Sequence, residues 1–243
     1  GGDGGGARGA ALYVHNAVLG LPRSPVMEHA YWGEEYSPAE AARQLREAGA
    51  RWEEVEDEEK LLGRVVERLM RGEVVGWHQG RFEWGPRALG NRSILANPAR
   101  EDMKEIVNTK IKFREPFRPF APSVLAERAG EFFDLDDPPR HYPARFMLLV
   151  APVRPEKRDA IPATTHVDGT GRLQTVFRET NPLYHKLIER FGSASGVPVV
   201  LNTSFNLRGE PIVNTPANSY RTFMASEMDA LVVGRFLLSK TPG

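Results

Sequence analysis

Basic side chains gather between Trp84 and Pro122, among glycines, prolines and aromatic residues. Prolines and aromatic rings stiffen a loop, and a stiff loop holds a guanidinium in a fixed direction. Such a guanidinium binds phosphate or carboxylate through two parallel hydrogen bonds. The stretch therefore predicts a site for a polyanionic small molecule, and the alternative is a set of surface ion pairs with neighbouring glutamates. Among its basic residues, the candidates for this site are Arg87, Arg92, Lys110, Lys112, Arg114 and Arg118.

The backbone around these residues favours their convergence. Arg87 has glycines on both sides, and glycines let a backbone approach a ligand closely. Lys112 and Arg114 are two residues apart, so on an extended segment their side chains point to the same side. We expect these three cations to act together, with Arg118 following after a bend set by proline.

A second polar segment surrounds a glycine-flanked turn that leads into a strand. It places His166, Asp168, Arg172 and Gln174 at the edge of that strand. His166 is a candidate for hydrogen bonding to a ligand or for proton transfer, because the ordinary pKa of histidine lies near physiological pH. A purely structural role for this histidine is the alternative.

A third polar segment follows the apolar run 199–201. Asn202, Thr203, Ser204 and Asn206 come at the carboxyl end of this expected strand, where α/β folds commonly bind ligands. The alternative is a turn in which these side chains bind their own backbone. Ser204 is not expected to act as a nucleophile, because no Gly-x-Ser-x-Gly elbow surrounds it.

The glycine-rich start of the chain is a candidate phosphate loop. Gly4 and Gly5 precede an expected helix, and the N-terminus of a helix attracts phosphate. The alternative is a flexible linker or a cloning remnant. The six histidines form no His-Glu-x-x-His pair and no other local ligand pair, so the sequence encodes no complete metal site.

Composition narrows the class of protein. The 243 residues carry 32 basic and 32 acidic side chains, and this balance argues against a nucleic-acid coat or a membrane-surface binder. The absence of cysteine excludes disulfides and a thiolate nucleophile. No apolar run approaches the roughly 20 residues that span a bilayer, and no signal peptide is visible. We therefore expect a cytoplasmic protein.

The expected elements alternate between short strands and helices. Ser37-Pro38-Ala39-Glu40 is typical of a helix start, and Asp57 is expected to cap a second helix. This alternation predicts an α/β fold with a twisted, open mixed sheet and flanking helices. A boundary between residues 20 and 37 divides the chain into 1–36 and 37–243. The other expected helices are 7–19, 101–110, 182–191 and 217–226, and the expected strands are 52–55, 74–77, 93–96, 146–150, 173–177, 197–201 and 230–233.

Taken together, these segments resemble the carbamoyltransferases of the NodU/CmcH family, which includes antibiotic O-carbamoyltransferases. The resemblance covers nearly the whole chain, in order. It implies that 37–243 is a C-terminal YrdC-like domain, an open α/β sheet over a basic cavity. It also implies that 1–36 is a remnant of an N-terminal actin/Hsp70-like transferase domain and its linker. The matching segments are 85–90, 91–96, 112–122, 166–170, 172–175 and 202–206.

The resemblance implies a two-step reaction. The YrdC-like domain converts ATP, with Mg²⁺ expected, and carbamoyl phosphate into carbamoyl-adenylate. An N-terminal domain or partner chain then passes the carbamoyl group to a hydroxyl of a small-molecule acceptor. Catalytic screening of phosphate charge is expected from Lys112, Arg87, Arg114 and Arg118. Asn202, Ser204 and Asn206 are expected to recognise the carbamoyl amide, and the remaining expected substrate-binding residues are Arg92, His166, Asp168, Arg172, Thr203, Gly4 and Gly5.

Asp3 resembles an iron ligand in the family's last nucleotide-binding loop. The histidines that complete that site lie upstream in the family, so Fe²⁺ is expected only together with the N-terminal domain. The chain is then either a fragment or one subunit of a split enzyme, and a homodimer is kept open.

Other readings of the same resemblance remain. One is a non-catalytic YrdC-like module that binds nucleotide or an RNA end, although neither nucleic acid nor a membrane is the expected partner. Another is a threonylcarbamoyl-adenylate synthase for transfer RNA modification, which uses threonine and bicarbonate. A third is an inert expression fragment.

Overall fold

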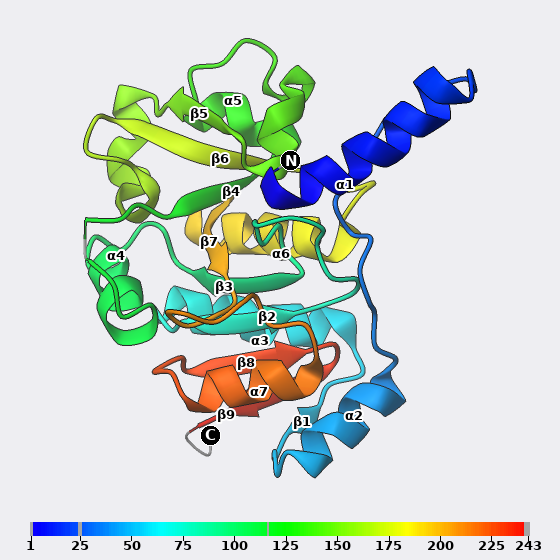
Figure 1. Ribbon diagram of the computed structural model, residues 1–243. Coiled ribbons are helices and arrows are strands. Elements are labelled where there is room, and N and C mark those ends of the chain that lie inside the picture. Colours follow the sequence, from blue (N-terminus) through cyan, green and yellow to red (C-terminus); the bar gives the residue numbers. More distant parts are fainter. Residues whose placement is uncertain (1, 24–25, 116, 241–243) are drawn as a thin grey trace.

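The computed structural model describes residues 2–23, 26–115 and 117–240, with side chains from residue 5 onward. Within these ranges the chain forms a nine-stranded sheet (Figure 1). The strands are β1 (Glu53–Glu54), β2 (Val75–His78), β3 (Arg92–Ala96), β4 (Ala121–Leu125), β5 (Leu149–Pro152), β6 (Thr170–Val176), β7 (Val199–Ser204), β8 (Ala230–Val233) and β9 (Phe236–Ser239).

The sheet is mixed, as the short links between its strands predicted. Its order is β1-β9-β8-β2-β3-β7-β4-β6-β5. The pairs β2·β8 and β4·β6 are parallel, and the other pairs are antiparallel. The expected α/β class with an open mixed sheet is therefore confirmed.

Helices cover both faces of the sheet (Figure 1). The helices α3 and α6 pack on one face, and α2, α7 and the region of α4 pack on the other. The α-helices are α1 (Gly2–Tyr13), α2 (Pro38–Glu47), α3 (Glu58–Met70), α4 (Met103–Ile106), α5 (Ala129–Phe132), α6 (Pro182–Ser195) and α7 (Pro216–Met224). Two π-helical turns span Val14–Val18 and Val107–Ile111, and 3₁₀ turns span Ala126–Arg128, Pro138–Arg140, Tyr142–Phe146, Pro155–Ala160 and Pro162–Thr164.

Local capping places two helix starts where the sequence predicted them. The Ser37 hydroxyl accepts from the Glu40 backbone N–H at 3.3 Å, and the Glu40 carboxylate accepts from the Ser37 N–H at 2.9 Å. The Asp57 carboxylate accepts from the Lys60 N–H at 3.2 Å. These bonds satisfy amides that have no partner within a helix.

Two strands were missed, and one expected helix was wrong. The strands β4 and β9 were not expected, and the expected helix 101–110 is only the short α4 followed by a π-helical turn. Pro122 obscured β4 because proline donates no hydrogen bond. The structure tolerates it near the start of the strand, since pairing with β6 begins only at Ser123.

The N-terminal segment differs from the rest of the chain. The helix α1 projects from the body of the molecule (Figure 1), and every described strand lies after residue 36. Tyr31 nevertheless forms a β-bridge with Glu83, and its hydroxyl donates to the Leu89 carbonyl at 2.8 Å. The end of this segment therefore packs against the loop between β2 and β3. The division at residue 36 stays a prediction.

Gly90→Ala tests how tightly that loop is packed. Gly90 has φ +109°, and an added Cβ would overlap the buried ring of Tyr184. We expect the free energy of unfolding to fall by about 3 kcal/mol, because overpacking and a strained backbone act together. Gly196→Ala is the control, since Gly196 has φ +77° but open space around it. Urea denaturation measures both variants, and equal losses would contradict the packing argument.

Candidate functional site

A cavity of about 250 Å³ opens between the chain segment after the π-helical turn 107–111 and the segment after β7. The structure brings together here five residues that the sequence placed in one site. Four further residues complete the lining. The cavity is lined by Lys112, Arg114, Glu115, Arg118, Ser204, Asn206, Leu207, Arg208 and Gly209.

Lys112 is the most buried cation of this cavity, with 5 % of its surface exposed. Its Nζ donates to the Ser204 carbonyl at 2.5 Å, the Asn206 carbonyl at 3.0 Å and Asn206 Oδ1 at 2.8 Å. Burial, together with the nearby charge of Arg114, lowers the pKa of Lys112 to about 7. The ammonium is therefore fixed at the cavity wall and is close to its titration point at neutral pH.

Lys112 and Arg114 reach the cavity by a route that the sequence did not predict. The expected extended segment was wrong, because Lys112 has φ −86° and ends the π-helical turn, while Phe113 has φ +48°. Arg114 Nε donates to Asn108 Oδ1 at 2.7 Å, and its guanidinium lies 4.8 Å from the centre of the Phe120 ring. These two contacts fix the direction of Arg114.

Positive charge continues beyond the cavity. Burial and the neighbouring charges of Arg87 and Arg114 lower the pKa of Arg172 to about 10. The Nε atoms of Arg87 and Arg172 are buried and have no hydrogen-bond partner in the described part of the chain. Arg172 thus lies near enough to two other guanidiniums to be repelled by both, and two buried guanidinium nitrogens have no acceptor among the described residues. Such an arrangement favours a bound anion, which would supply the missing charge and acceptors.

Ion pairing accounts for only part of the basic cluster. Arg118 pairs with Glu115 at 2.9 Å, and both side chains are about half exposed. Exposed pairs of this kind add little stability. Glu83 binds backbone amides and Glu127 binds His185, so neither neutralises the cluster.

His166 lies beside this cluster, half-buried. The Thr170 hydroxyl donates to Asp168 Oδ1 at 2.7 Å, so it accepts from His166 Nδ1 at 3.0 Å. The hydrogen is therefore on Nδ1, and Nε2 is left as an acceptor. Burial lowers the pKa of His166, Arg172 lowers it further and Asp168 opposes. Asp168 itself is exposed and shapes the turn that presents the histidine.

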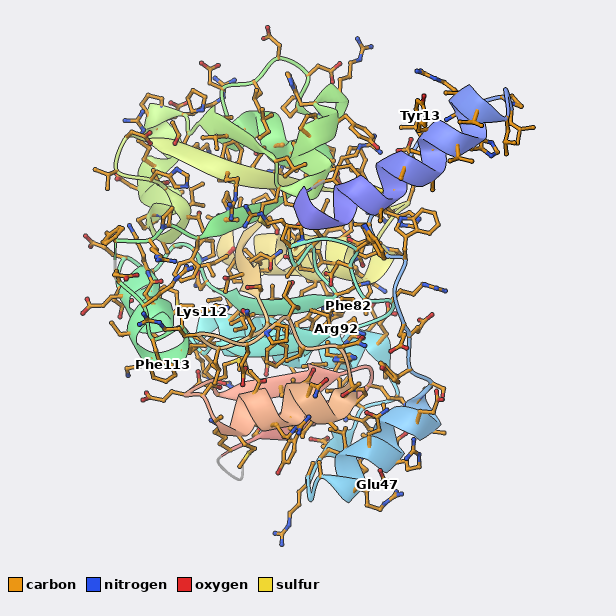
Figure 2. The ribbon with its side chains drawn as sticks, in the orientation of Figure 1. Tyr13, Glu47, Phe82, Arg92, Lys112 and Phe113 are labelled. Atoms are coloured by element: carbon orange, nitrogen blue, oxygen red, sulfur yellow. The ribbon has the colours of Figure 1, made fainter. Side chains whose placement is uncertain are left out.

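Arg92 and Asn202 lie outside the cavity. Arg92 is fully buried and donates to the Gln79 carbonyl at 2.6 Å and to the Asn214 carbonyl at 3.2 Å. Figure 2 shows it beside Phe82, apart from Lys112. Asn202 Nδ2 donates to the Ala88 carbonyl at 3.1 Å, and so lies beneath the loop that carries Arg87.

The remaining predicted residues are scattered. Thr203 is a half-buried residue of β7 opposite Ile94. Gly4 and Gly5 lie within α1 and not before it, and the side chain of Asp3 lies outside the described ones. The described residues contain no group of three or more His, Asp or Glu that could hold a metal ion. This search does not include the Asp3 side chain, so its expected role as one ligand of an iron site completed by another domain stays a prediction, and no step is assigned to iron.

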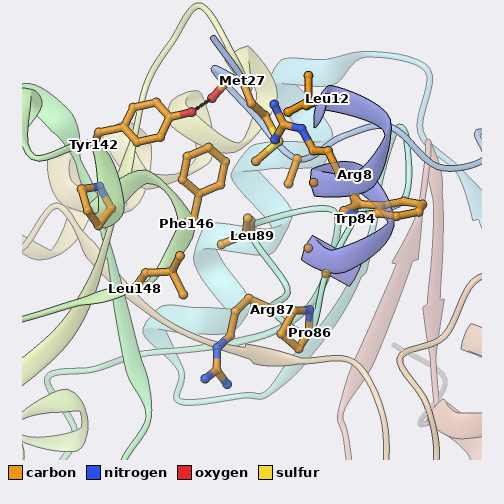
Figure 3. Close-up of a pocket in the computed structure, with 15 residues that line it drawn as sticks. Arg8, Leu12, Met27, Trp84, Pro86, Arg87, Leu89, Tyr142, Phe146 and Leu148 are labelled. Carbon is orange, nitrogen blue, oxygen red and sulfur yellow. Dashed lines mark hydrogen bonds between the residues drawn. The ribbon is translucent and has the colours of Figure 1, made fainter. Parts of the chain in front are cut away.

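A second cavity of about 410 Å³ lies between α1, the loop 84–89 and the turns at 142–148. Its lining is mainly apolar and includes the rings of Trp84, Tyr142 and Phe146. Figure 3 shows the guanidinium of Arg87 directed away from Tyr142 and Phe146. Arg87 therefore contributes its aliphatic stem to this cavity and its charge to the region of Arg172.

Arg208 also lines the first cavity and was not predicted from the sequence. The available signal was its place directly after the polar run 202–206, before Gly209. Ser123 was not predicted either, and its hydroxyl donates to Gln174 Oε1 at 2.7 Å beneath the Arg87 loop.

Solved structures share this fold. The crystal structure of P. abyssi Sua5 complexed with L-threonine matches with a TM-score of 0.54 and 16 % identity, over 74 % of this chain and 48 % of that one. Full-length HypF in its phosphate- and nucleotide-bound form matches with a TM-score of 0.50 and 15 % identity, over 78 % of this chain and 22 % of that one. The expected YrdC-like fold is confirmed.

No helix in the described part of the chain is long and apolar enough to cross a membrane.

Sequence relatives indicate the family. Nodulation protein NolNO of Sinorhizobium fredii is 46 % identical over 98 % of this chain. The 3'-hydroxymethylcephem-O-carbamoyltransferase of Streptomyces clavuligerus is 37 % identical over 96 % of it, and an uncharacterized protein of Synechocystis sp. is 45 % identical over 99 %. The chain spans only 35 %, 41 % and 42 % of these three relatives. The family model for the carbamoyltransferase C-terminus matches residues 66–240, and the chain belongs to this carbamoyltransferase family.

Proposed function

We propose that this chain activates carbamoyl phosphate with ATP, forming carbamoyl-adenylate and releasing phosphate and pyrophosphate. The observation that carries the proposal is the convergence of Lys112, Arg114 and Arg118 on one cavity, with Arg87 and Arg172 beside it. Membership of the carbamoyltransferase family supports a carbamoyl group as the cargo.

The chemistry requires this much positive charge. Hydrolysis of carbamoyl phosphate by water breaks its bond to phosphate and gives carbamate, phosphate and a proton. A carbamate oxygen then attacks the α-phosphorus of ATP while the bond to pyrophosphate breaks. The two reactants are both anionic and repel each other until cations screen them. The attacking carbamate oxygen already carries charge, so its attack on ATP needs no general base. Fixed cations also stabilise the charge that builds on the leaving pyrophosphate.

Ser204 and Asn206 serve in this proposal to place Lys112. Asn206 Oδ1 accepts from both Lys112 and the Ser204 hydroxyl, the latter at 2.8 Å, and its Nδ2 donates to the Glu210 carbonyl at 2.8 Å. Asn206 thus uses both ends of its amide within the protein. An incoming phosphate oxygen would replace these protein acceptors. It would accept one hydrogen bond from the Lys112 ammonium and another from the Ser204 hydroxyl.

The second step of the proposal lies outside this chain. A hydroxyl of a small-molecule acceptor would receive the carbamoyl group on a transferase domain, as the name of the cephem relative suggests. Mg²⁺ is proposed to accompany ATP through its phosphates, and no residue is assigned to it. The likeness to Sua5 concerns the fold alone, so threonine with bicarbonate serves as a comparison substrate in the tests below.

Lys112→Ala and Arg87→Ala test the cationic site. Each variant is expected to lower carbamoyl-phosphate-dependent exchange of pyrophosphate into ATP by about 10²–10³-fold, because one fixed donor to the developing charge is lost. Circular dichroism checks that the fold is kept.

Arg178→Ala is the matched control for these two variants. Arg178 is exposed and pairs with Glu189 on α6, so the exchange rate is expected to stay unchanged. Near-normal exchange in both Lys112→Ala and Arg87→Ala would remove the catalytic assignment. Exchange that depends on threonine and bicarbonate instead would move the activity to threonylcarbamoyl-adenylate.

The chain alone is expected to perform only the first half of the reaction. With ATP and carbamoyl phosphate it should form carbamoyl-adenylate, detected by mass spectrometry, yet leave a hydroxymethylcephem acceptor unmodified. Carbamoylation of that acceptor without any added transferase domain would refute this division of labour.

Proton uptake on binding ATP tests the state of Lys112. With a pKa of about 7 the side chain is mostly neutral at pH 8, and a bound polyphosphate raises its pKa. Binding at pH 8 should therefore take up close to one proton, whereas at pH 6 the lysine is already charged and its uptake should vanish. Calorimetry in buffers of different ionisation enthalpy measures the uptake. Lys112→Met keeps the apolar stem and should abolish the difference between pH 6 and pH 8, and equal uptake at both pH values in the unaltered chain would contradict the prediction.

A further inference from the structure

A buried carboxylate lies in the loop between β2 and β3, away from the cations of the cavity. Glu83 is 1 % exposed, and its Oε1 accepts three backbone N–H groups. These come from Leu89 at 2.8 Å, Asn91 at 2.7 Å and Arg92 at 3.2 Å. One side chain thus draws the far end of the loop around a single oxygen atom.

Carbonyl groups of the same loop are held from the opposite direction. Asn202 Nδ2 donates to the Ala88 carbonyl at 3.1 Å, and Gln174 Nε2 donates to the Leu89 carbonyl at 2.8 Å. Trp77 Nε1 donates to the Gly90 carbonyl at 2.9 Å. The peptide groups after residue 88 are therefore fixed by buried side chains on both sides.

The preceding part of the loop is different. The backbone N–H groups of Arg87 and Ala88 have no hydrogen-bond partner among the described residues, and Arg87 Nε is buried without one. Successive free amides beside a guanidinium form a favourable environment for an oxyanion. The part of the loop after residue 88 is thus rigid, and it holds the preceding part, at Arg87 and Ala88, whose hydrogen-bond donors can bind a ligand.

Glu83 itself is costly to bury. Its Oε2 has no partner among the described residues, and burial raises its pKa while the three amides and Arg92 oppose that shift. A buried carboxylate with one bare oxygen loses hydration free energy. Such cost is often retained where it sets the geometry of a functional site.

We propose that Glu83 is a positioning residue for Arg87, holding the loop so that the Arg87 guanidinium and the N–H groups of Arg87 and Ala88 meet phosphate oxygens of the substrate. This inference rests on the proposed function, and deepens it by assigning one anionic group of the substrate to a specific loop.

A double-mutant cycle with Glu83→Gln, Arg87→Ala and the combined variant tests this role. The measurements are pyrophosphate exchange and the calorimetric affinity for ATP, together with the midpoint of thermal unfolding. Glu83→Gln keeps the shape and one acceptor but removes the charge that gathers the three amides. When Arg87 is present, we expect Glu83→Gln to lower kcat/KM for carbamoyl phosphate by about 10–100-fold. In the Arg87→Ala background we expect it to lower kcat/KM by less than about twofold, because the effects of coupled residues are not additive.

A merely structural carboxylate would behave otherwise. It would lower activity by the same factor with or without Arg87, and that result, or normal activity in Glu83→Gln, would overturn the inference. Asp229→Asn is the matched control, because the Asp229 carboxylate accepts from the Val74 N–H at 2.7 Å at a different place in the sheet. Asp229→Asn should leave kcat/KM for carbamoyl phosphate unchanged, both with Arg87 and in the Arg87→Ala background.

Failure of the proposed function gives a different pattern from failure of this inference. If the unaltered chain catalyses no exchange and Arg87→Ala binds ATP normally, the proposed function falls, and the role of Glu83 falls with it. If Arg87→Ala is impaired and the cycle is additive, only the role of Glu83 is lost.

Discussion

Repulsion among neighbouring cations is the constraint on which the rest of the site depends. The lowered pKa values of Arg172 and Lys112 show that their charged forms are disfavoured by burial and by other cations nearby. Lys112 and Arg114 are held against that repulsion by contacts within the protein. The Lys112 ammonium donates to the carbonyl groups of Ser204 and Asn206, and Arg114 Nε donates to Asn108 Oδ1 on the neighbouring π-helical turn. The fold thus concentrates positive charge at a cost that a bound polyphosphate would offset.

The sheet supplies the rigid frame for this charge. Ser123, Gln174 and Asn202 lie on the adjacent strands β4, β6 and β7, and their side chains form one buried hydrogen-bonded group. The same group binds the Ala88 and Leu89 carbonyls of the loop that carries Arg87. Hydrogen bonds offset the cost of burying polar groups, and a connected network of such bonds is rigid. The packing of the sheet therefore also determines the direction of Arg87.

Features that depend on residues close together in the sequence, such as helix caps, could be predicted. Contacts between residues far apart in the sequence could not. The caps at Ser37 and Asp57 depend on neighbours three residues away, so the helix starts were read correctly. Arg92 resembles the other arginines of its stretch in composition, yet one of its partners lies 122 residues away at Asn214. Lys112 meets Ser204 across 92 residues, and its expected extended backbone was wrong, although both residues were placed in the same site.

Fold similarity alone cannot decide between chemistries, since Sua5 and HypF match this chain at only 16 % and 15 % identity. The proposed activation of carbamoyl phosphate therefore rests on the residues of the site. A lysine with a pKa of about 7 reduces the charge that an empty site must carry and restores it when an anion enters. Arginines cannot respond in this way, because they stay protonated at any physiological pH. In the proposed function the arginines fix where the polyphosphates bind, and Lys112 makes the full positive charge dependent on their presence.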